Sequence, residues 1–177
     1  MSEPTTHLDA RYGDATAPLP WARTQQLFAT AELYWLSTVR RDGRPHVTPL
    51  IGVWHDRSFY FCTGQEEQKC RNLLDDPGVS VTTGSNTWSS GTDVVLEGSA
   101  AQVTDQYELA EVSAAYLAKY GEDWRFEVHD EGGVVGGGRE GIEEDETEPL
   151  ALVFRVPPEK VIAFTKDPHG QTTHDFA

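Results

Sequence analysis

The residues best suited to chemistry follow one another in one stretch, from an aromatic strand through a turn to a helix. An aromatic run at 59–61, followed by Cys62, leads into Thr63 and Gly64, where a helix should begin. A helix N-terminus presents unpaired backbone N–H groups and a partial positive charge, so this turn could hold a phosphate. Lys69 and Arg71, one to two turns farther along, could add full positive charges.

The same turn has a plainer interpretation. Residues 63–66 read Thr-Gly-Gln-Glu, which matches a capping box in which Glu66 satisfies the helix start by itself. Glu66 and Glu67 would also repel an anion. Spacing alone favours the plain cap, because short motifs often match by chance.

Composition excludes several classes of function. The 177 residues, 38% of them hydrophobic, suffice for one domain with a proper core. The net charge of −15 argues against nucleic-acid binding, since no basic stripe could neutralise phosphates. Residues 122–148 carry much of this negative charge, so a small anionic ligand elsewhere remains compatible with it.

The chain has no features expected of a membrane or secreted protein. No run of about twenty apolar residues could span a membrane. The first residues have neither the charged nor the apolar region of a signal peptide. Cys62 and Cys70 are the only cysteines, too few for a disulfide framework, and a cytoplasmic location is expected.

The pattern of elements predicts a mainly β protein with few helices. We expect a flexible arm over 1–17, then a single domain over 18–177 that contains a mobile acidic, Gly-rich loop at about 121–149. Helices are predicted over 18–31, 65–75 and 105–120, with a helical turn at 157–160. Strands are predicted over 33–40, 44–54, 58–62, 79–83, 93–103, 150–156 and 161–164. This order favours an antiparallel barrel over a doubly wound sheet.

The remaining motifs point to no catalytic residue and no metal site. Residues 136–141 match G-x-G-x-x-G, but no strand precedes them and acidic residues flank them, which indicates a loop. The six histidines form no pair with metal-ligand spacing. Trp88 lies in a polar loop and could wall the substrate side of a site.

Several segments together resemble the pyridoxamine-phosphate-oxidase-like split barrels that bind FMN. The resemblance rests on residues 34–50, Gly52-Val53-Trp54, 61–64 with 69–73, 93–100 and 158–164, and it covers roughly 20–120 and 150–164. The chain is most similar to the actinobacterial branch that uses FMN or the deazaflavin coenzyme F-420. The resemblance implies a six-stranded antiparallel split β-barrel, usually a homodimer with the cofactor between protomers.

The resemblance also implies the site residues. Cofactor contacts would come from His46, Val47, Thr48 and Pro49 on one strand, and from Thr63, Gly64, Lys69 and Asn72. Lys69 falls on the family's phosphate-binding lysine, which reverses the preference for a plain cap. Gln68 and Thr48 stand where pyridoxamine phosphate oxidases carry arginines, which argues against vitamin B6 oxidation.

The expected function is that of an oxidoreductase that transfers hydride between FMN or F-420 and a small-molecule substrate. Such chemistry needs no acid–base pair from the protein, because the cofactor ring performs it. A non-catalytic flavin- or haem-binding protein is the alternative, and a structural dimer with a decayed site is a third possibility.

Overall fold

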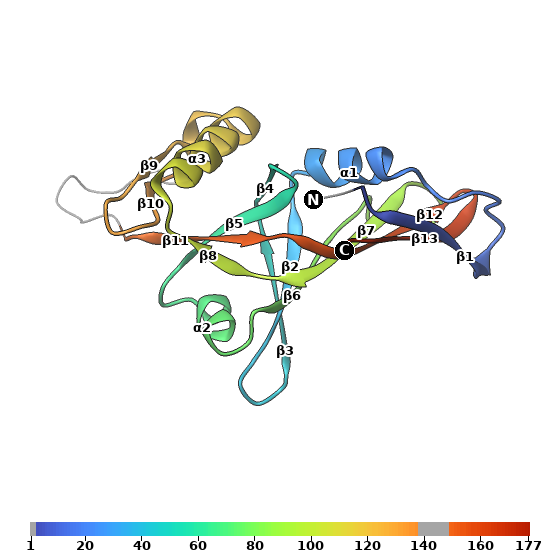
Figure 1. Ribbon diagram of the computed structural model, residues 1–177, viewed down its shortest axis with the longest axis horizontal. Helices are drawn as coiled ribbons and strands as arrows, with labels where there is room; N and C mark the ends of the chain where they lie inside the picture. Colours follow the sequence, from blue (N-terminus) through green and yellow to red (C-terminus); the bar gives the residue numbers. More distant parts are fainter. Residues whose placement is uncertain (1–2, 138–148) are drawn as a thin grey trace.

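Two curled antiparallel sheets make up most of the molecule (Figure 1). The computed structural model describes residues 3–137 and 149–177. Helices are α1 (Trp21–Thr30), α2 (Gln68–Asp75), α3 (Gln106–Tyr120) and the 3-10 turn η1 (Glu122–Trp124). Strands are β1 (Thr5–Gly13), β2 (Tyr34–Val39), β3 (Pro45–Leu50), β4 (Val53–His55), β5 (Ser58–Gly64), β6 (Gly78–Thr83), β7 (Thr92–Ser99), β8 (Ala101–Val103), β9 (Phe126–Val128), β10 (Val134–Gly136), β11 (Ala151–Val156), β12 (Pro158–Lys166) and β13 (His169–Asp175).

The larger sheet has the strand order β1-β13-β12-β7-β6-β2-β3 and the smaller one the order β4-β5-β11-β10-β9, with β8 also pairing with β11. Every pairing among the described strands is antiparallel. The predicted mainly β, antiparallel split-barrel class is therefore confirmed. The described residues divide the barrel wall among more and shorter strands than the six expected.

Strand β5 separates two hydrophobic cores, because alternate side chains of a strand point to opposite faces. Phe59 and Phe61 are buried in a core between the sheets, together with Tyr34 and Leu36 of β2. Tyr60 points the other way, into a smaller core beneath α3. This two-sided burial fixes β5, and with it the turn that leads into α2.

Helix α3 begins and ends where the sequence predicts. The Asp105 side chain accepts a hydrogen bond from the Glu108 N–H at 2.9 Å, which caps the first turn. Gly121 ends the helix with φ +83°, a conformation that favours glycine. Leu109, Val112 and Tyr116 are buried against β4 and β5, and each contributes about 1.5–3 kcal/mol of apolar burial.

The flexible arm expected over 1–17 is wrong for Thr5–Gly13, which form β1 and pair with β13. The buried His174 side chain links this strand to α1: its Nδ1 lies 2.8 Å from Thr6 Oγ1, and its Nε2 lies 2.9 Å from Thr24 Oγ1. β1 and β13 are both rich in polar residues. Neither shows the alternation of apolar and polar residues from which a strand is predicted, so their pairing could not be predicted from the sequence.

Three further expectations need correction. The strand predicted over 44–54 divides at Gly52 and crosses from one sheet to the other; a Cβ there would lie 2.3 Å from the Phe59 ring. The helical turn predicted at 157–160 is the start of β12, because Pro158 pairs with Gly98. The strand predicted over 93–103 ends at Ser99, and β8 joins the smaller sheet.

The acidic segment predicted as a mobile loop over 121–149 carries structure in its first half. Residues 122–136 form η1, β9 and β10, and the Phe126 ring packs edge-on against Tyr116 at a centroid distance of 5.1 Å. Packing against α3 therefore orders residues 122–136, although their acidic and Gly-rich composition is typical of a loop. Residues 138–148 lie outside the described residues, and so does most of the glycine motif at 136–141.

Candidate functional site

The end of β5 and the start of α2 place three hydrogen-bond donors around one acceptor position. These donors are the Thr63 hydroxyl, the Gly64 N–H and the Lys69 ammonium group, which we call the anion cradle. Glu67 fills the acceptor position: its Oε1 accepts from Gly64 N at 2.8 Å and from Thr63 Oγ1 at 3.3 Å, and its Oε2 accepts from Lys69 Nζ. Lys69 is almost fully buried, whereas about half of the Glu67 side chain is exposed.

The predicted capping box is therefore wrong in its details. Helix α2 begins at Gln68 with Glu67 as its N-cap, three residues later than expected, and the Gly64 N–H is satisfied by Glu67 instead of Glu66. Glu66 forms an exposed ion pair with Arg71 at 2.5 Å. The sequence cannot distinguish two adjacent glutamates, because the choice depends on the path of the turn after Gly64.

The electrostatics of the cradle favour an anion. Burial raises the pKa of the Glu67 carboxyl, but hydrogen bonds from Lys69 and Gly64 outweigh it, so the net pKa is lowered. Glu67 is thus ionised at neutral pH, and the donors of the cradle stabilise its charge.

A chain of polar contacts extends from α2 to β3. Gln68 Nε2 donates to Asn72 Oδ1 at 2.7 Å, and Asn72 Nδ2 donates to the Thr38 hydroxyl at 2.8 Å. Thr38 Oγ1 lies 3.5 Å from His46 Nδ1. Burial lowers the pKa of His46, as do the nearby positive charges of Arg40 and Lys69, which places His46 beside the cradle as a neutral imidazole.

The four predicted residues of β3 divide between two faces of the strand. His46 and Thr48 point inward, opposite Thr38 and Leu36 of β2, while Val47 and Pro49 point outward. The Thr48 hydroxyl is buried and, alone among the described buried side-chain N and O atoms, has no hydrogen-bond partner. A buried unpaired hydroxyl is costly, so it marks a place where a ligand could supply the missing partner.

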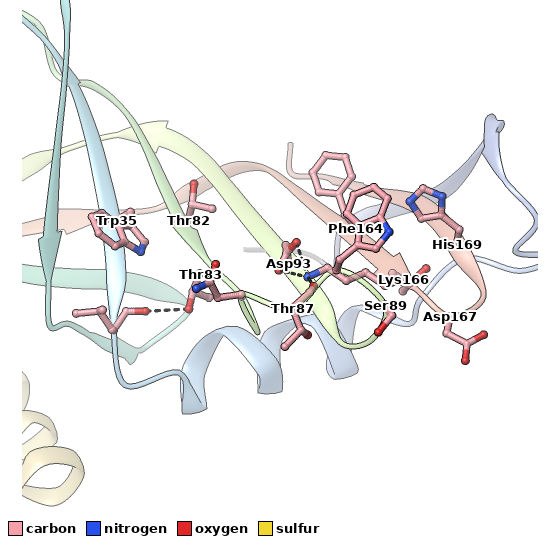
Figure 2. A pocket seen from close by; sticks show the side chains of 15 residues that line it. Trp35, Thr82, Thr83, Thr87, Ser89, Asp93, Phe164, Lys166, Asp167 and His169 are labelled. Carbon is pink, nitrogen blue, oxygen red and sulfur yellow. Dashed lines mark hydrogen bonds and ion pairs between the residues drawn. The ribbon is translucent and has the colours of Figure 1, made fainter.

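Figure 2 shows an outer groove of about 1190 Å³ that is lined by Trp35 of β2. Trp35 points to the opposite face of the sheet from Leu36, the partner of Thr48, so the groove lies outside the wall that the inward-facing residues of β3 line. It runs from Trp35 of β2, across the ends of β6 and β7, to Phe164 and His169 at the β12–β13 turn. Trp88 also lines it from the loop between β6 and β7 and is 90% exposed. Sequence reasoning singled out Trp88 but missed Trp35, Asp93 and Lys166, whose strands are far apart in the chain.

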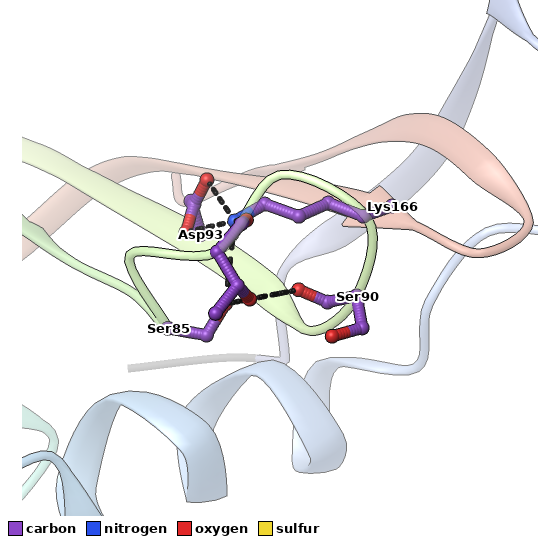
Figure 3. A network of polar contacts seen from close by, with 5 residues as sticks. Ser85, Ser90, Asp93 and Lys166 are labelled. Atoms are coloured by element: carbon purple, nitrogen blue, oxygen red, sulfur yellow. Dashed lines mark hydrogen bonds and ion pairs between the residues drawn. The ribbon is translucent and has the colours of Figure 1, made fainter.

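Lys166 holds the loop of the outer groove in place (Figure 3). Its Nζ lies 2.9 Å from Asp93 Oδ2, 3.2 Å from Ser85 Oγ, and donates to the Thr87 carbonyl oxygen. The Ser85 hydroxyl in turn donates to the Ser90 carbonyl at 3.0 Å. One ammonium group thereby joins β12, β7 and the first half of the loop that carries Trp88, and Ser85 links that half to Ser90.

Within residues 3–137 and 149–177, no group of three or more His, Cys, Asp or Glu side chains could hold a metal ion. Among the same residues, no helix is both long and apolar enough to cross a membrane.

The fold is that of the pyridoxamine-phosphate-oxidase-like split barrels. The family model described as pyridoxamine 5'-phosphate oxidase matches residues 21–163, which is most of the chain, so the chain belongs to this family. A comparison with curated proteins finds no match.

Solved structures with the same fold carry different descriptions. A conserved hypothetical protein from Mycobacterium tuberculosis is 20% identical, with a TM-score of 0.64 over 84% of this chain and 86% of that one. An FAD binding protein from Mycobacterium smegmatis is 17% identical, with a TM-score of 0.57 over 82% and 95%. A heme binding protein from the same organism is 17% identical, with a TM-score of 0.66 over 88% and 59%. Flavin and haem binders therefore share this fold.

Proposed function

We propose that this protein is an oxidoreductase that binds FMN or the deazaflavin coenzyme F-420 and acts on a small-molecule substrate by hydride transfer. One observation carries the proposal: three donors converge on a single anionic group where β5 meets α2. Membership of the pyridoxamine 5'-phosphate oxidase family supports flavin chemistry at this position.

The residues fit such a cofactor in distinct ways. Lys69 and the Gly64 N–H would hold a phosphate group in place of the Glu67 carboxylate, since a buried ammonium group and a backbone N–H both bind anions. The unpaired Thr48 hydroxyl would hydrogen-bond to a polar edge of the ring, beside Asn72 and the neutral His46. The bound ring supplies the hydride chemistry, so the chain itself needs no catalytic residue.

The outer face of β2 and β3 supports a homodimer. Trp35, Val39 and Val47 are exposed on this face, and in register with them lie Pro49 and Pro45. An apolar strip of this kind is typical of a protein–protein interface, and a second copy would bury it. Trp88 and the outer groove adjoin this strip, since Trp35 belongs to both, so a second copy placed there would also cover the groove. Light scattering at micromolar concentration should give about twice the 19.6 kDa monomer mass, and Val47→Glu should shift it to the monomer.

Titration of the purified protein with FMN, F-420 and haem, followed by fluorescence or absorbance, tests the cofactor. The proposal is supported if the protein binds FMN or F-420 and also catalyses oxidation of the reduced cofactor by an added electron acceptor. Haem binding without flavin binding would replace it with a non-catalytic haem-binding function.

Lys69→Met tests the phosphate assignment. Loss of one charge-assisted hydrogen bond, about 1.5–3 kcal/mol, should weaken FMN about 10- to 150-fold. Riboflavin, which lacks the phosphate, should bind the variant and the wild type alike. An equal FMN affinity in both proteins would exclude Lys69 as the phosphate ligand.

A further inference from the structure

The anion cradle already contains an anion, and that anion belongs to the chain. Both Glu67 carboxylate oxygens are engaged, Oε1 with Gly64 and Thr63 and Oε2 with Lys69. A phosphate monoester could use the same donors only if the carboxylate left, because two anionic groups at such short range repel each other.

We propose that Glu67 is a specificity-determining residue that competes with phosphate for the cradle. This inference rests on the proposed function for its choice of ligand. It predicts that displacement of the Glu67 carboxylate offsets part of the binding free energy of a ligand's phosphate group, so the wild type gains less affinity from that group than a variant without this carboxylate.

The burial of the two partners shows which of them can move. The Lys69 side chain is 7% exposed and is enclosed by the surrounding protein, whereas the Glu67 side chain is 49% exposed and can rotate into water. Glu67 is also the N-cap, and its side chain accepts from no N–H of α2's first turn, so its departure leaves the helix hydrogen bonds intact. The cradle therefore opens on the Glu67 side.

Glu66 provides a matched control. It lies one residue earlier, carries the same charge and pairs with Arg71 on the surface, where its side chain is 93% exposed. Glu66→Gln removes the same charge from the same turn without freeing the cradle, so it isolates a general electrostatic effect from competition within the site.

The experiment compares FMN and riboflavin affinities of the wild type, Glu67→Gln and Glu66→Gln by fluorescence titration. Glu67→Gln should bind FMN about tenfold more tightly or better and riboflavin within about twofold of the wild type. Glu66→Gln should change neither by more than about twofold. Gln keeps the size of Glu and can still accept from the Gly64 N–H, and a thermal melt checks that the variant folds.

A second measurement uses inorganic phosphate and needs no flavin. Phosphate should shift the amide resonance of Gly64 in Glu67→Gln at concentrations that leave the wild type and Glu66→Gln unchanged. If no flavin binds any variant but phosphate behaves in this way, the proposed cofactor is wrong and the competition by Glu67 stands. Equal phosphate responses and equal FMN-to-riboflavin ratios in all three proteins would overturn it, as would an equal gain in Glu66→Gln.

Discussion

Two lysines with little exposed side chain, Lys69 and Lys166, each pair with a carboxylate, but the two pairs differ in how much of the fold depends on them. Lys69 pairs with Glu67, two residues away, and Lys166 pairs with Asp93, 73 residues away. Lys69 and Glu67 belong to one turn, so separating them disturbs only that turn and its contact with the end of β5. Lys166 joins two strands and a loop, so separating it from Asp93 disturbs all three.

This difference indicates which pair can take part in binding. An ion pair that closes within one turn can open and exchange its carboxylate for a ligand. An ion pair that joins distant segments must stay closed for the groove around it to keep its shape. A buried charge by itself therefore does not indicate a binding site. A binding site is indicated where the charged residue and its partner are close in the sequence and the partner is exposed enough to move away.

The largest expected effect comes from Lys166→Met. The variant leaves Asp93 and the Thr87 carbonyl without their shared donor, and we expect a loss of about 2 kcal/mol in the free energy of unfolding, since Asp93 is partly exposed and screened. Urea unfolding measures it. Lys160→Met, on the same strand but outside this network, is the control, and an equal loss in both variants would contradict the structural role of Lys166.

Lys69→Met should cost less, about 1 kcal/mol, because Glu67 can turn into water once its partner is gone. The same unfolding measurement applies to it. A cost as large as that of Lys166→Met would mean that the cradle pair is also structural, and the comparison between the two lysines would fail.

Thr48→Val should change stability by only a few tenths of a kcal/mol, and in the stabilising direction, because it removes a buried hydroxyl that has no partner in the described structure. If that hydroxyl binds the ring, FMN and riboflavin should weaken together, by about tenfold. This pattern differs from that of Lys69→Met, which spares riboflavin. Unchanged affinity for both ligands would remove Thr48 from the site.

The smallest effect concerns acid. Because the folded protein lowers the pKa of Glu67, the unfolded chain binds a proton more readily at this group. The contribution of Glu67 to stability is therefore complete above its unfolded pKa and is lost as the pH falls through the folded value. Between about pH 6 and about pH 3.5, the wild type should lose more unfolding free energy than Glu67→Gln, measured by denaturant titration at each pH. Parallel curves for the two proteins would show that the cradle does not stabilise the carboxylate.

Local signals made much of the fold predictable. Asp105 with Glu108 three residues later marks the start of α3, and the Asp42-Gly43 turn joins β2 to β3, with Gly43 at φ +83°. Strands with an apolar face, such as β6 and β11, were also predicted, to within a residue or two at their ends.

What the sequence missed depends on contacts between distant residues. β13 buries Thr172, Thr173 and His174, polar residues that only hydrogen bonding across the sheet can make favourable inside. The cradle donors Thr63, Gly64 and Lys69 were predicted, but their acceptor Glu67 was treated only as a charge that repels anions. Its actual role follows from the geometry of one turn, which the sequence does not specify.

The position of β13 sets an order on assembly at the ribosome. β13 lies between β1 and β12, and its His174 bonds to Thr6, 168 residues earlier in the chain. β1 precedes β13 in the chain, so it has no strand to pair with until β13 has been synthesised. The nascent chain therefore carries β1 as an unpaired strand until β13 has been made, and the low apolar content of β1 keeps that strand from associating with other chains in the meantime.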